Sequence, residues 1–201
     1  MKLKAMTMLA AFTAMAAHAG GKSQTSADRS VTVCVEGEGL STVEWRAKGL
    51  ASVMFANIGV QLNWRNGLRE CPERGIMISL TGRTPSDLKP GALAYALPYE
   101  GTHVQVFVDR IFEMFQEATV PTVLGYVFVH EITHVLQGVA RHSESGVMKA
   151  HWTGDDCGQM GCRALKFESK DIDLIGDSGA VGLEPPQRGE RGRDSAKPSS
   201  L

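Results

Sequence analysis

Residues 130–134 read His-Glu-Ile-Thr-His, and this short stretch constrains the chain more than any other feature of its sequence. On an α-helix, residues four positions apart lie one above the other on the same face. Two neutral imidazoles placed in this way can bind one zinc ion, and the glutamate between them can reach a water molecule on that ion. The stretch therefore predicts a helix on which His130 and His134 are metal ligands and Glu131 is a general base.

The helix expected around this stretch, over residues 123–136, is apolar on nearly all sides. A helix of that kind is buried in the fold. Buried imidazole and carboxylate groups need polar partners, because an unpaired charge away from water is very costly. A bound metal ion with its water would satisfy all three groups. A helix that carries an unrelated pair of histidines is the alternative, and it would leave the same groups without partners.

A catalytic zinc ion usually takes three protein ligands and keeps a fourth position for water. His142 is the natural third ligand, because Gly138 can end the helix in a left-handed conformation at little steric cost and turn the chain back toward the metal. Glu144 is the alternative third ligand, since some zinc peptidases use a carboxylate in this role. Those carboxylates usually lie on a later helix, and this favours His142.

The same region carries a longer pattern, HExxH followed after seven residues by HSxxGVM, which runs from His130 to Met148. This pattern resembles that of the metzincin clan of zinc endopeptidases, and that of the matrixins most closely. The resemblance implies that one catalytic zinc ion (Zn2+) is bound by His130, His134 and His142, with Glu131 as the general base. It also implies that Met148 forms the Met-turn, a packing floor beneath the imidazoles.

The spacing departs from the metzincin pattern at one point. Metzincins have five residues between the second and third histidines, with a glycine three residues after the second histidine. This chain has seven residues between His134 and His142, and Gly138 stands one place late. The loop that carries the third ligand is therefore two residues longer, and the spacing is similar to that of a bacterial group of metzincin-like proteins.

The first 19 residues are typical of a signal peptide. Lys2 and Lys4 form a charged start, residues 6–17 are apolar but too short to span a bilayer, and small residues favour cleavage after Ala19. A retained amphipathic helix is the alternative interpretation. No later segment reaches the length of a transmembrane helix. We therefore expect a secreted or periplasmic protein without an integral membrane segment after signal removal.

Export makes disulfide bonds possible, and the chain has four cysteines. Four cysteines allow three pairings. The spacing favours a bond between Cys34 and Cys71, which joins two early segments, and a bond between Cys157 and Cys162, which closes a small glycine-rich loop. A zinc knuckle is the competing interpretation, but the C-x-x-C spacing that is typical of such sites is absent.

The middle of the chain, residues 30–176, is long enough for one domain with its own core. Alternating or β-branched apolar residues predict five strands, at residues 31–35, 60–64, 76–80, 92–97 and 104–108. Helical spacing and end signals predict further helical segments, at residues 42–58, 111–116 and 169–175. For the first of these, Ser41 or Thr42 is the expected N-cap and Gly59 the expected end.

The resemblance implies an arrangement for these elements. It is an α+β (mixed) fold of the metzincin-like zincin type, with a twisted, mostly parallel five-stranded sheet, a backing helix, the active-site helix and a small C-terminal subdomain. The upper part would run to about residue 138 and the lower part over residues 139–176, with the active site in the cleft between them. The fourth strand, residues 91–97, would form the upper rim, where an exposed edge can pair with an extended peptide.

The residues after 176 are glycine, proline, serine and charged residues, with too few apolar side chains to offset the entropy lost on ordering. Residues 177–201 are therefore expected to form a disordered tail. The formal net charge is −1 with both signs mixed, and nothing in it indicates nucleic acid or an anionic membrane as a partner.

These features together predict a secreted zinc metalloendopeptidase that hydrolyses peptide bonds by water on the zinc ion, activated by Glu131. Its expected partner is a peptide or protein substrate, and the pattern makes no prediction of oligomeric state. One alternative is a catalytically silent, secreted zinc-binding or interaction module on the same scaffold. Another is a lytic enzyme that acts on cell wall, although the usual zinc patterns of such enzymes combine histidine and aspartate at other spacings. His151 could line the pocket with Trp152, but a surface position is favoured.

Overall fold

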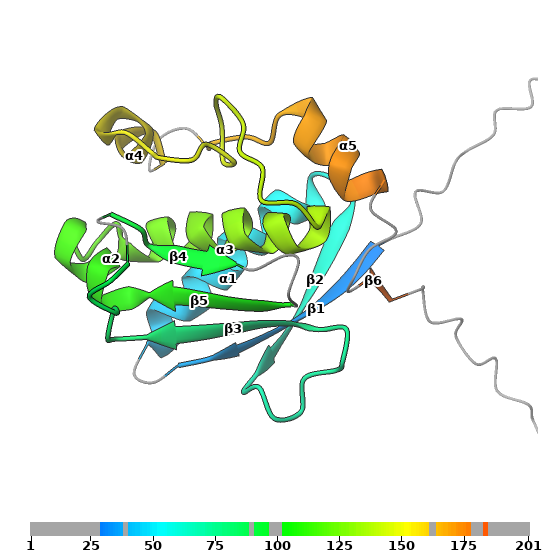
Figure 1. Ribbon diagram of the computed structural model, residues 1–201, viewed down its shortest axis with the longest axis horizontal. Helices are drawn as coiled ribbons and strands as arrows, with labels where there is room; N and C mark the ends of the chain where they lie inside the picture. Colours follow the sequence, from blue (N-terminus) through cyan, green and yellow to red (C-terminus); the bar gives the residue numbers. More distant parts are fainter. Residues whose placement is uncertain are drawn as a thin grey trace, which may run out of the picture.

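The computed structural model describes residues 29–37, 40–88, 91–96, 102–160, 164–177 and 183–184. The predicted signal peptide and its cleavage site lie outside these ranges. Within them the chain forms a sheet with two long helices on one face and a further layer of loops and two short helices beyond those (Figure 1). No helix in these ranges is both long enough and apolar enough to cross a membrane.

Five strands form the main sheet, in the order β2-β1-β3-β5-β4. The bounds of the strands are β1 (Arg29–Glu36), β2 (Val60–Asn66), β3 (Ile76–Thr81), β4 (Ala94–Ala96) and β5 (His103–Phe107). Neighbours among β2, β1, β3 and β5 pair in parallel, and β4 runs antiparallel to β5. The predicted α+β fold with a mostly parallel five-stranded sheet is therefore confirmed.

The residues of β1 divide between the two faces of the sheet. Val31, Val33 and Val35 belong to the hydrophobic core that the sheet forms with the helices. Cys34 points to the opposite face, where a disulfide bond joins it to Cys71 in the loop before β3, with 5.8 Å between the Cα atoms. The predicted Cys34–Cys71 bond is confirmed. Cys34 is fully buried although it lies on the face of the sheet opposite the helices, where the disulfide bond brings the loop that carries Cys71 over β1.

The second predicted disulfide bond has a different outcome. Cys157 is a free thiol in the structure. Its predicted partner, Cys162, lies outside the described residues, so the bond stays a prediction. Cys157 does not lie in a loop, as the sequence suggested, but on α4 (Gly154–Met160), a short helix that was not predicted.

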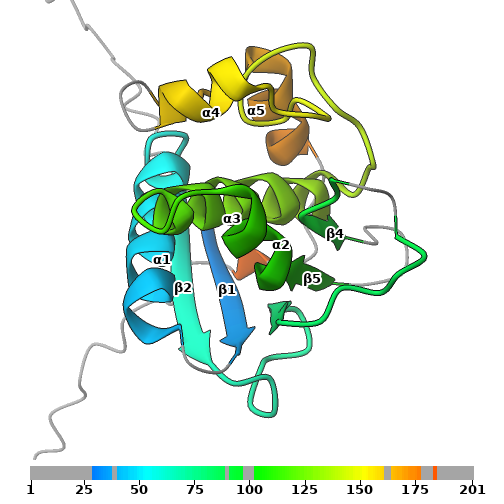
Figure 2. The same ribbon diagram turned by 90° about the vertical axis from the view of Figure 1, so that its left-hand side faces the viewer.

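The helices α1 (Ser41–Ala56) and α3 (Val120–Gln137) lie side by side across one face of the sheet (Figures 1 and 2). Gly125 allows their close approach, because a Cβ atom there would stand 2.8 Å from Cδ2 of Leu50. The predicted N-cap of α1 is wrong. Leu40 occupies that position, and its apolar side chain makes no capping hydrogen bond. Its carbonyl oxygen accepts from the N–H of Glu44 at 2.7 Å, so Ser41 is the first helical residue.

The helix α3 carries the HExxH stretch, and almost every residue of it is buried. It lies between the sheet and the C-terminal layer, which explains why its sequence is apolar on nearly all sides (Figure 1). Pro121 lies in its first turn, and Gly138 ends it with a φ of +63°, in the left-handed region. The N–H of Gly138 donates to the carbonyl oxygen of His134 at 3.0 Å. The predicted helix and its predicted end are confirmed.

The remaining described elements lie in different parts of the fold. The predicted helical turn at 111–116 is the helix α2 (Val108–Met114), and the predicted helix at 169–175 is α5 (Ser169–Asp177). Within the predicted disordered tail, Leu183–Glu184 form the short strand β6, which pairs antiparallel with the first half of β1. That pairing is available because β3 contacts β1 only from Val33 onward. The other residues after 177 lie outside the described part.

Candidate active site

Three histidines converge at the C-terminal half of α3. His130 and His134 lie one turn apart on the helix, and His142 lies on the loop that follows. One ring nitrogen from each of the three lies within 4.8 Å of the others, and the group could hold a metal ion. Glu144, the alternative third ligand, is exposed and is not part of this group. The structure thus brings together the three predicted ligands, and their role as ligands stays a prediction.

The protonation of the two helical histidines follows from their partners. Nδ1 of His130 lies 2.9 Å from the carbonyl oxygen of Val147, and Nδ1 of His134 lies 3.2 Å from that of Val139. A carbonyl oxygen can only accept a hydrogen bond, so each Nδ1 atom carries the proton of its neutral ring. Both Nε2 atoms are then left with a lone pair.

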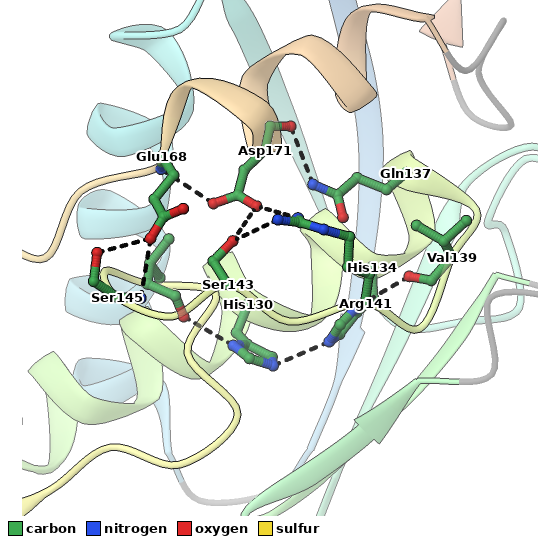
Figure 3. Close-up of polar contacts among 10 residues, drawn as sticks. His130, His134, Gln137, Val139, Arg141, Ser143, Ser145, Glu168 and Asp171 are labelled. Atoms are coloured by element: carbon green, nitrogen blue, oxygen red, sulfur yellow. Dashed lines mark hydrogen bonds and ion pairs between the residues drawn. The ribbon is translucent and has the colours of Figure 1, made fainter.

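These two Nε2 atoms lie 3.0 Å apart (Figure 3). Two lone pairs that face each other without a proton between them repel, and a cation between them removes the repulsion. Zinc–nitrogen bonds of about 2.0–2.1 Å in a tetrahedral site place two ligand atoms about 3.3 Å apart. The spacing and the protonation of the two rings therefore fit a zinc ion.

Burial favours the neutral form of the same rings. It lowers the pKa of His130 to about 3 and that of His134 to about 4, because a charged imidazolium loses its hydration inside the protein. The pKa of His142 is also lowered, first by burial and then by repulsion from His151 and Arg141. All three rings are accordingly neutral near pH 7, and the neutral imidazole is the form that binds metals.

Glu131 lines the same cavity as the three histidines. Its side chain is buried, and this burial raises its pKa to about 8 because the carboxylate form is poorly solvated there. A group whose pKa lies near neutrality is well suited to accept and return a proton. The position of Glu131 thus agrees with the general-base role that the sequence predicts for it.

The turn before Met148 contacts the first predicted ligand. Gly146 has a φ of +74°, and a Cβ atom there would lie 2.2 Å from the carbonyl oxygen of Lys166, so that only glycine fits. The next residue, Val147, donates its N–H to the same Lys166 oxygen at 2.9 Å and offers its own carbonyl oxygen to His130. Met148 itself is fully buried in the hydrophobic core.

A cavity of about 430 Å³ opens beside the histidines. Residues 91–96, which include β4 at the edge of the main sheet, form one wall, and residues 149–152 form part of another. The predicted upper rim, residues 91–97, therefore faces the cavity over its described part. The ring of Trp152 stands edge-on to His130 with 5.7 Å between the centroids. His151 is exposed, as the favoured interpretation of the sequence predicts. It also lines the cavity, as the alternative interpretation predicts.

Sequence reasoning missed several residues of the lining of this cavity. Among them are four from the helices α2, α3 and α4 and the end of α2: Met114, Phe115, Val127 and Cys157. The sequence could have predicted one of them, because Val127 lies four residues before Glu131 and therefore on the same face of α3. The others come from α2, its end and α4, and no local pattern connects them to the HExxH stretch.

The chain matches no protein-family model, and no curated protein is similar to it in sequence. Solved structures are similar to it. Archaemetzincin from Methanopyrus kandleri has a TM-score of 0.50 with 15% identity, over 76% of this chain and 96% of its own. A zinc-dependent peptidase from Methanocorpusculum labreanum has a TM-score of 0.49 with 10% identity, over 72% of this chain and 99% of its own.

Myroilysin is a third, more distant neighbour, with a TM-score of 0.35 and 17% identity over 72% of this chain and 65% of its own. The likeness to archaemetzincin, at 15% identity, shows the fold alone. The fold is that of archaemetzincin, in agreement with the metzincin-like fold that the sequence predicted. The closer likeness to matrixins stays a prediction.

Proposed function

We propose that this protein is a zinc-dependent endopeptidase. The observation that carries the proposal is the 3.0 Å contact between the Nε2 atoms of His130 and His134. Neither Nε2 atom carries a proton, because the proton of each neutral ring is on Nδ1, which donates to a carbonyl oxygen. A buried carboxylate, Glu131, and a third imidazole, His142, line the cavity at the same place. The same fold occurs in archaemetzincin, and this adds support for a zinc peptidase.

His130, His134 and His142 would hold one zinc ion. When bound, zinc supplies a Lewis acid that polarises the peptide carbonyl group and makes water more acidic. Glu131 takes the proton from the attacking water and delivers it to the nitrogen of the leaving amine. Its place in the cavity beside the three histidines supports this role. Trp152 stands edge-on to His130, and both line the cavity in which the scissile bond would lie.

The substrate would be a peptide or protein segment in an extended conformation. β4 pairs with β5 along one edge, and its residues line the cavity together with the histidines. An extended peptide can add to such an edge through main-chain hydrogen bonds. This type of recognition needs no chain terminus, and it therefore supports an endopeptidase.

We further propose that the protein is secreted or periplasmic. The Cys34–Cys71 disulfide bond is formed, and disulfide bonds persist mainly in oxidising compartments. The sequence of residues 1–19 supports the same compartment, since it has the charged start, apolar stretch and small residues of a signal peptide.

The proposal is tested with purified protein and a mixture of peptides of random sequence. We expect cleavage at internal bonds, loss of cleavage after treatment with a chelator, and recovery when one equivalent of zinc is added. Cleavage that persists in chelator would contradict the role of zinc. Protein that retains one zinc ion per chain but cleaves no peptide would instead support the catalytically silent zinc-binding module.

A further inference from the structure

His142 differs from the other two predicted ligands in how its ring is held. The Nδ1 atoms of His130 and His134 both donate to carbonyl oxygens. No hydrogen bond to the His142 ring exists among the described residues, and the side chain is exposed on the long loop after α3. Metal-binding histidines almost always donate the N–H of their other ring nitrogen to a carboxylate, a backbone carbonyl or water. Because no protein group among the described residues fixes the His142 ring, the position of the third ligand depends on how its backbone is held.

We infer that Asp171, Ser143 and Arg141 are positioning residues that hold the backbone on both sides of His142, an inference that rests on the proposed zinc site. Oδ1 of Asp171 accepts from Oγ of Ser143 at 2.6 Å and from Nη1 of Arg141 at 2.8 Å (Figure 3). Nη2 of Arg141 also donates to Oγ of Ser143, at 3.3 Å. The three side chains form a closed triangle, and two of them are the residues immediately before and after His142.

Asp171 is itself fixed to the rest of the fold. It lies in the first turn of α5, where its Oδ2 atom accepts from the N–H of Glu168 at 3.1 Å. Its carbonyl oxygen accepts from Nε2 of Gln137 at 3.0 Å, and Gln137 is the last residue of α3. The triangle therefore ties the loop that carries His142 to the helix that carries the other two ligands.

The burial of Asp171 favours an intact triangle. The side chain of Asp171 is 0% exposed, whereas that of Arg141 is 27% exposed. A fully buried carboxylate that loses a hydrogen-bond donor keeps a negative charge that is no longer fully balanced, and this is costly. The hydrogen bonds from Ser143 and Arg141 to Asp171 are therefore strongly favoured. A loop that is already held before the metal binds loses less conformational freedom on binding. The triangle should thus contribute to zinc affinity through His142 and through no other ligand.

The loop offers a matched pair of serines for the test. Ser143 and Ser145 both donate to an acidic side chain in or beside the first turn of α5, since Oγ of Ser145 lies 2.7 Å from Oε1 of Glu168. Only Ser143 is adjacent to His142. We expect Ser143→Ala to lower zinc affinity about 10- to 100-fold, the range found for residues that orient metal ligands. Ser145→Ala should leave zinc affinity close to that of the unchanged protein.

The experiment measures zinc affinity by competition with a chelator for the full chain and for the variants Ser143→Ala, Ser143→Thr, Asp171→Asn and Ser145→Ala. Ser143→Thr keeps the hydroxyl group and should restore most of the affinity. Asp171→Asn should weaken binding at least as much as Ser143→Ala. If Asp171→Asn fails to fold, the two serine variants still decide the question.

The same measurements in a His142→Ala background separate positioning from general stability. If Ser143 acts through His142, then Ser143→Ala should have no further effect on zinc affinity once His142 is gone. An equal loss of affinity in both backgrounds would overturn the inference, and so would wild-type affinity in Ser143→Ala while His142→Ala binds weakly. Either result would leave the proposed function standing. Absence of zinc binding in the unchanged protein would overturn the proposed function and the inference together.

Discussion

The carbonyl oxygen of Val147 lies 2.9 Å from Nδ1 of His130, so the turn before Met148 holds the ring of the first predicted ligand directly. The two residues are 17 positions apart, and the turn reaches the ring because the N–H of Val147 is anchored to Lys166. The turn before Met148 therefore acts on the ring of His130 through a backbone group, and the Met-turn role of Met148 stays a prediction.

Zinc binding is the first prediction. We expect one zinc ion per chain, and tight binding should be lost in His130→Ala and in His134→Ala, because each variant leaves two ligands in place of three. Metal analysis after dialysis measures the stoichiometry. Stoichiometric zinc in the His130→Ala/His134→Ala double variant would show that the metal lies elsewhere.

The second prediction concerns Glu131. Glu131→Gln should retain zinc and lose about 10²- to 10⁴-fold of the rate of peptide cleavage, because the ligands stay while the group that moves the proton is gone. The variant is loaded with zinc, its metal content is measured, and cleavage of one peptide is followed. Near-normal turnover by zinc-loaded Glu131→Gln would rule out the general-base role.

The third prediction concerns the disulfide bond on the open face of β1. Cys34 and Cys71 are 37 positions apart, and a bond that closes a loop of this size stabilises a fold by about 2–4 kcal/mol. The Cys34→Ala/Cys71→Ala double variant should lose a similar amount of its free energy of unfolding, as measured by urea denaturation. In exported protein, alkylation of both thiols without a reductant would contradict the bond.

The fourth prediction concerns the pH dependence of the stability that Asp156 contributes through its contact with Lys149, a residue that lines the cavity. Oδ2 of Asp156 accepts from Nζ of Lys149 at 2.6 Å and from the N–H and Oγ1 of Thr153 at 2.7 and 2.9 Å. The hydrogen bond from Lys149, followed by those from Thr153, lowers the pKa of Asp156 from 3.8 to about 2. A carboxyl group with a lowered pKa stabilises the fold above its unfolded-state pKa, and this contribution is lost as the pH falls toward 2.

Metal-free Asp156→Asn should therefore be less stable than the metal-free unchanged protein at neutral pH, and the two should converge in acid between about pH 4 and pH 2. Midpoints of urea denaturation across this range measure the difference. A difference that is the same at pH 7 and pH 3 would show that ionisation of Asp156 plays no part in it.

The parts of the fold that the sequence predicts are those marked by residue type, periodicity or motif. Gly138 predicts the end of α3 because glycine takes the left-handed conformation at little cost, and the uniformly apolar sequence of α3 predicts its burial. The spacing of the cysteines favours a bond between Cys34 and Cys71, and the structure joins them. The HExxH stretch and the metzincin resemblance group His130, His134 and His142, and the structure brings their rings together.

The parts that could not be predicted depend on contacts without a local signal. The carbonyl groups of Val139 and Val147 orient two histidines, but every residue has a carbonyl group, so the sequence does not mark these two. Asp171 reaches Ser143 across 28 positions, and no periodicity connects them. The helix α4 is short and contains two glycines, so its sequence carried no helical pattern.

The last prediction decides between the two candidate third ligands and uses the bend at Gly138. Its φ of +63° is unfavourable for a residue with a Cβ atom, although nothing lies within 4 Å of the position that a Cβ would take. Gly138→Val should therefore cost about 1–2 kcal/mol through the backbone alone. It should also displace the carbonyl group of Val139, which holds Nδ1 of His134 at 3.2 Å. Zinc affinity should fall although no ligand is removed.

Gly138→Asn is the control, because asparagine tolerates the left-handed conformation better than valine, and it should bind zinc more tightly than Gly138→Val. His142→Ala should weaken zinc binding more than either glycine variant, since it removes a ligand. Glu144→Ala should leave binding unchanged, because that side chain is exposed and lies outside the histidine group. The reverse order, with Glu144 essential and His142 dispensable, would show that the third ligand is a carboxylate. The long loop after α3 would then close on the metal in a different way from the one the structure describes.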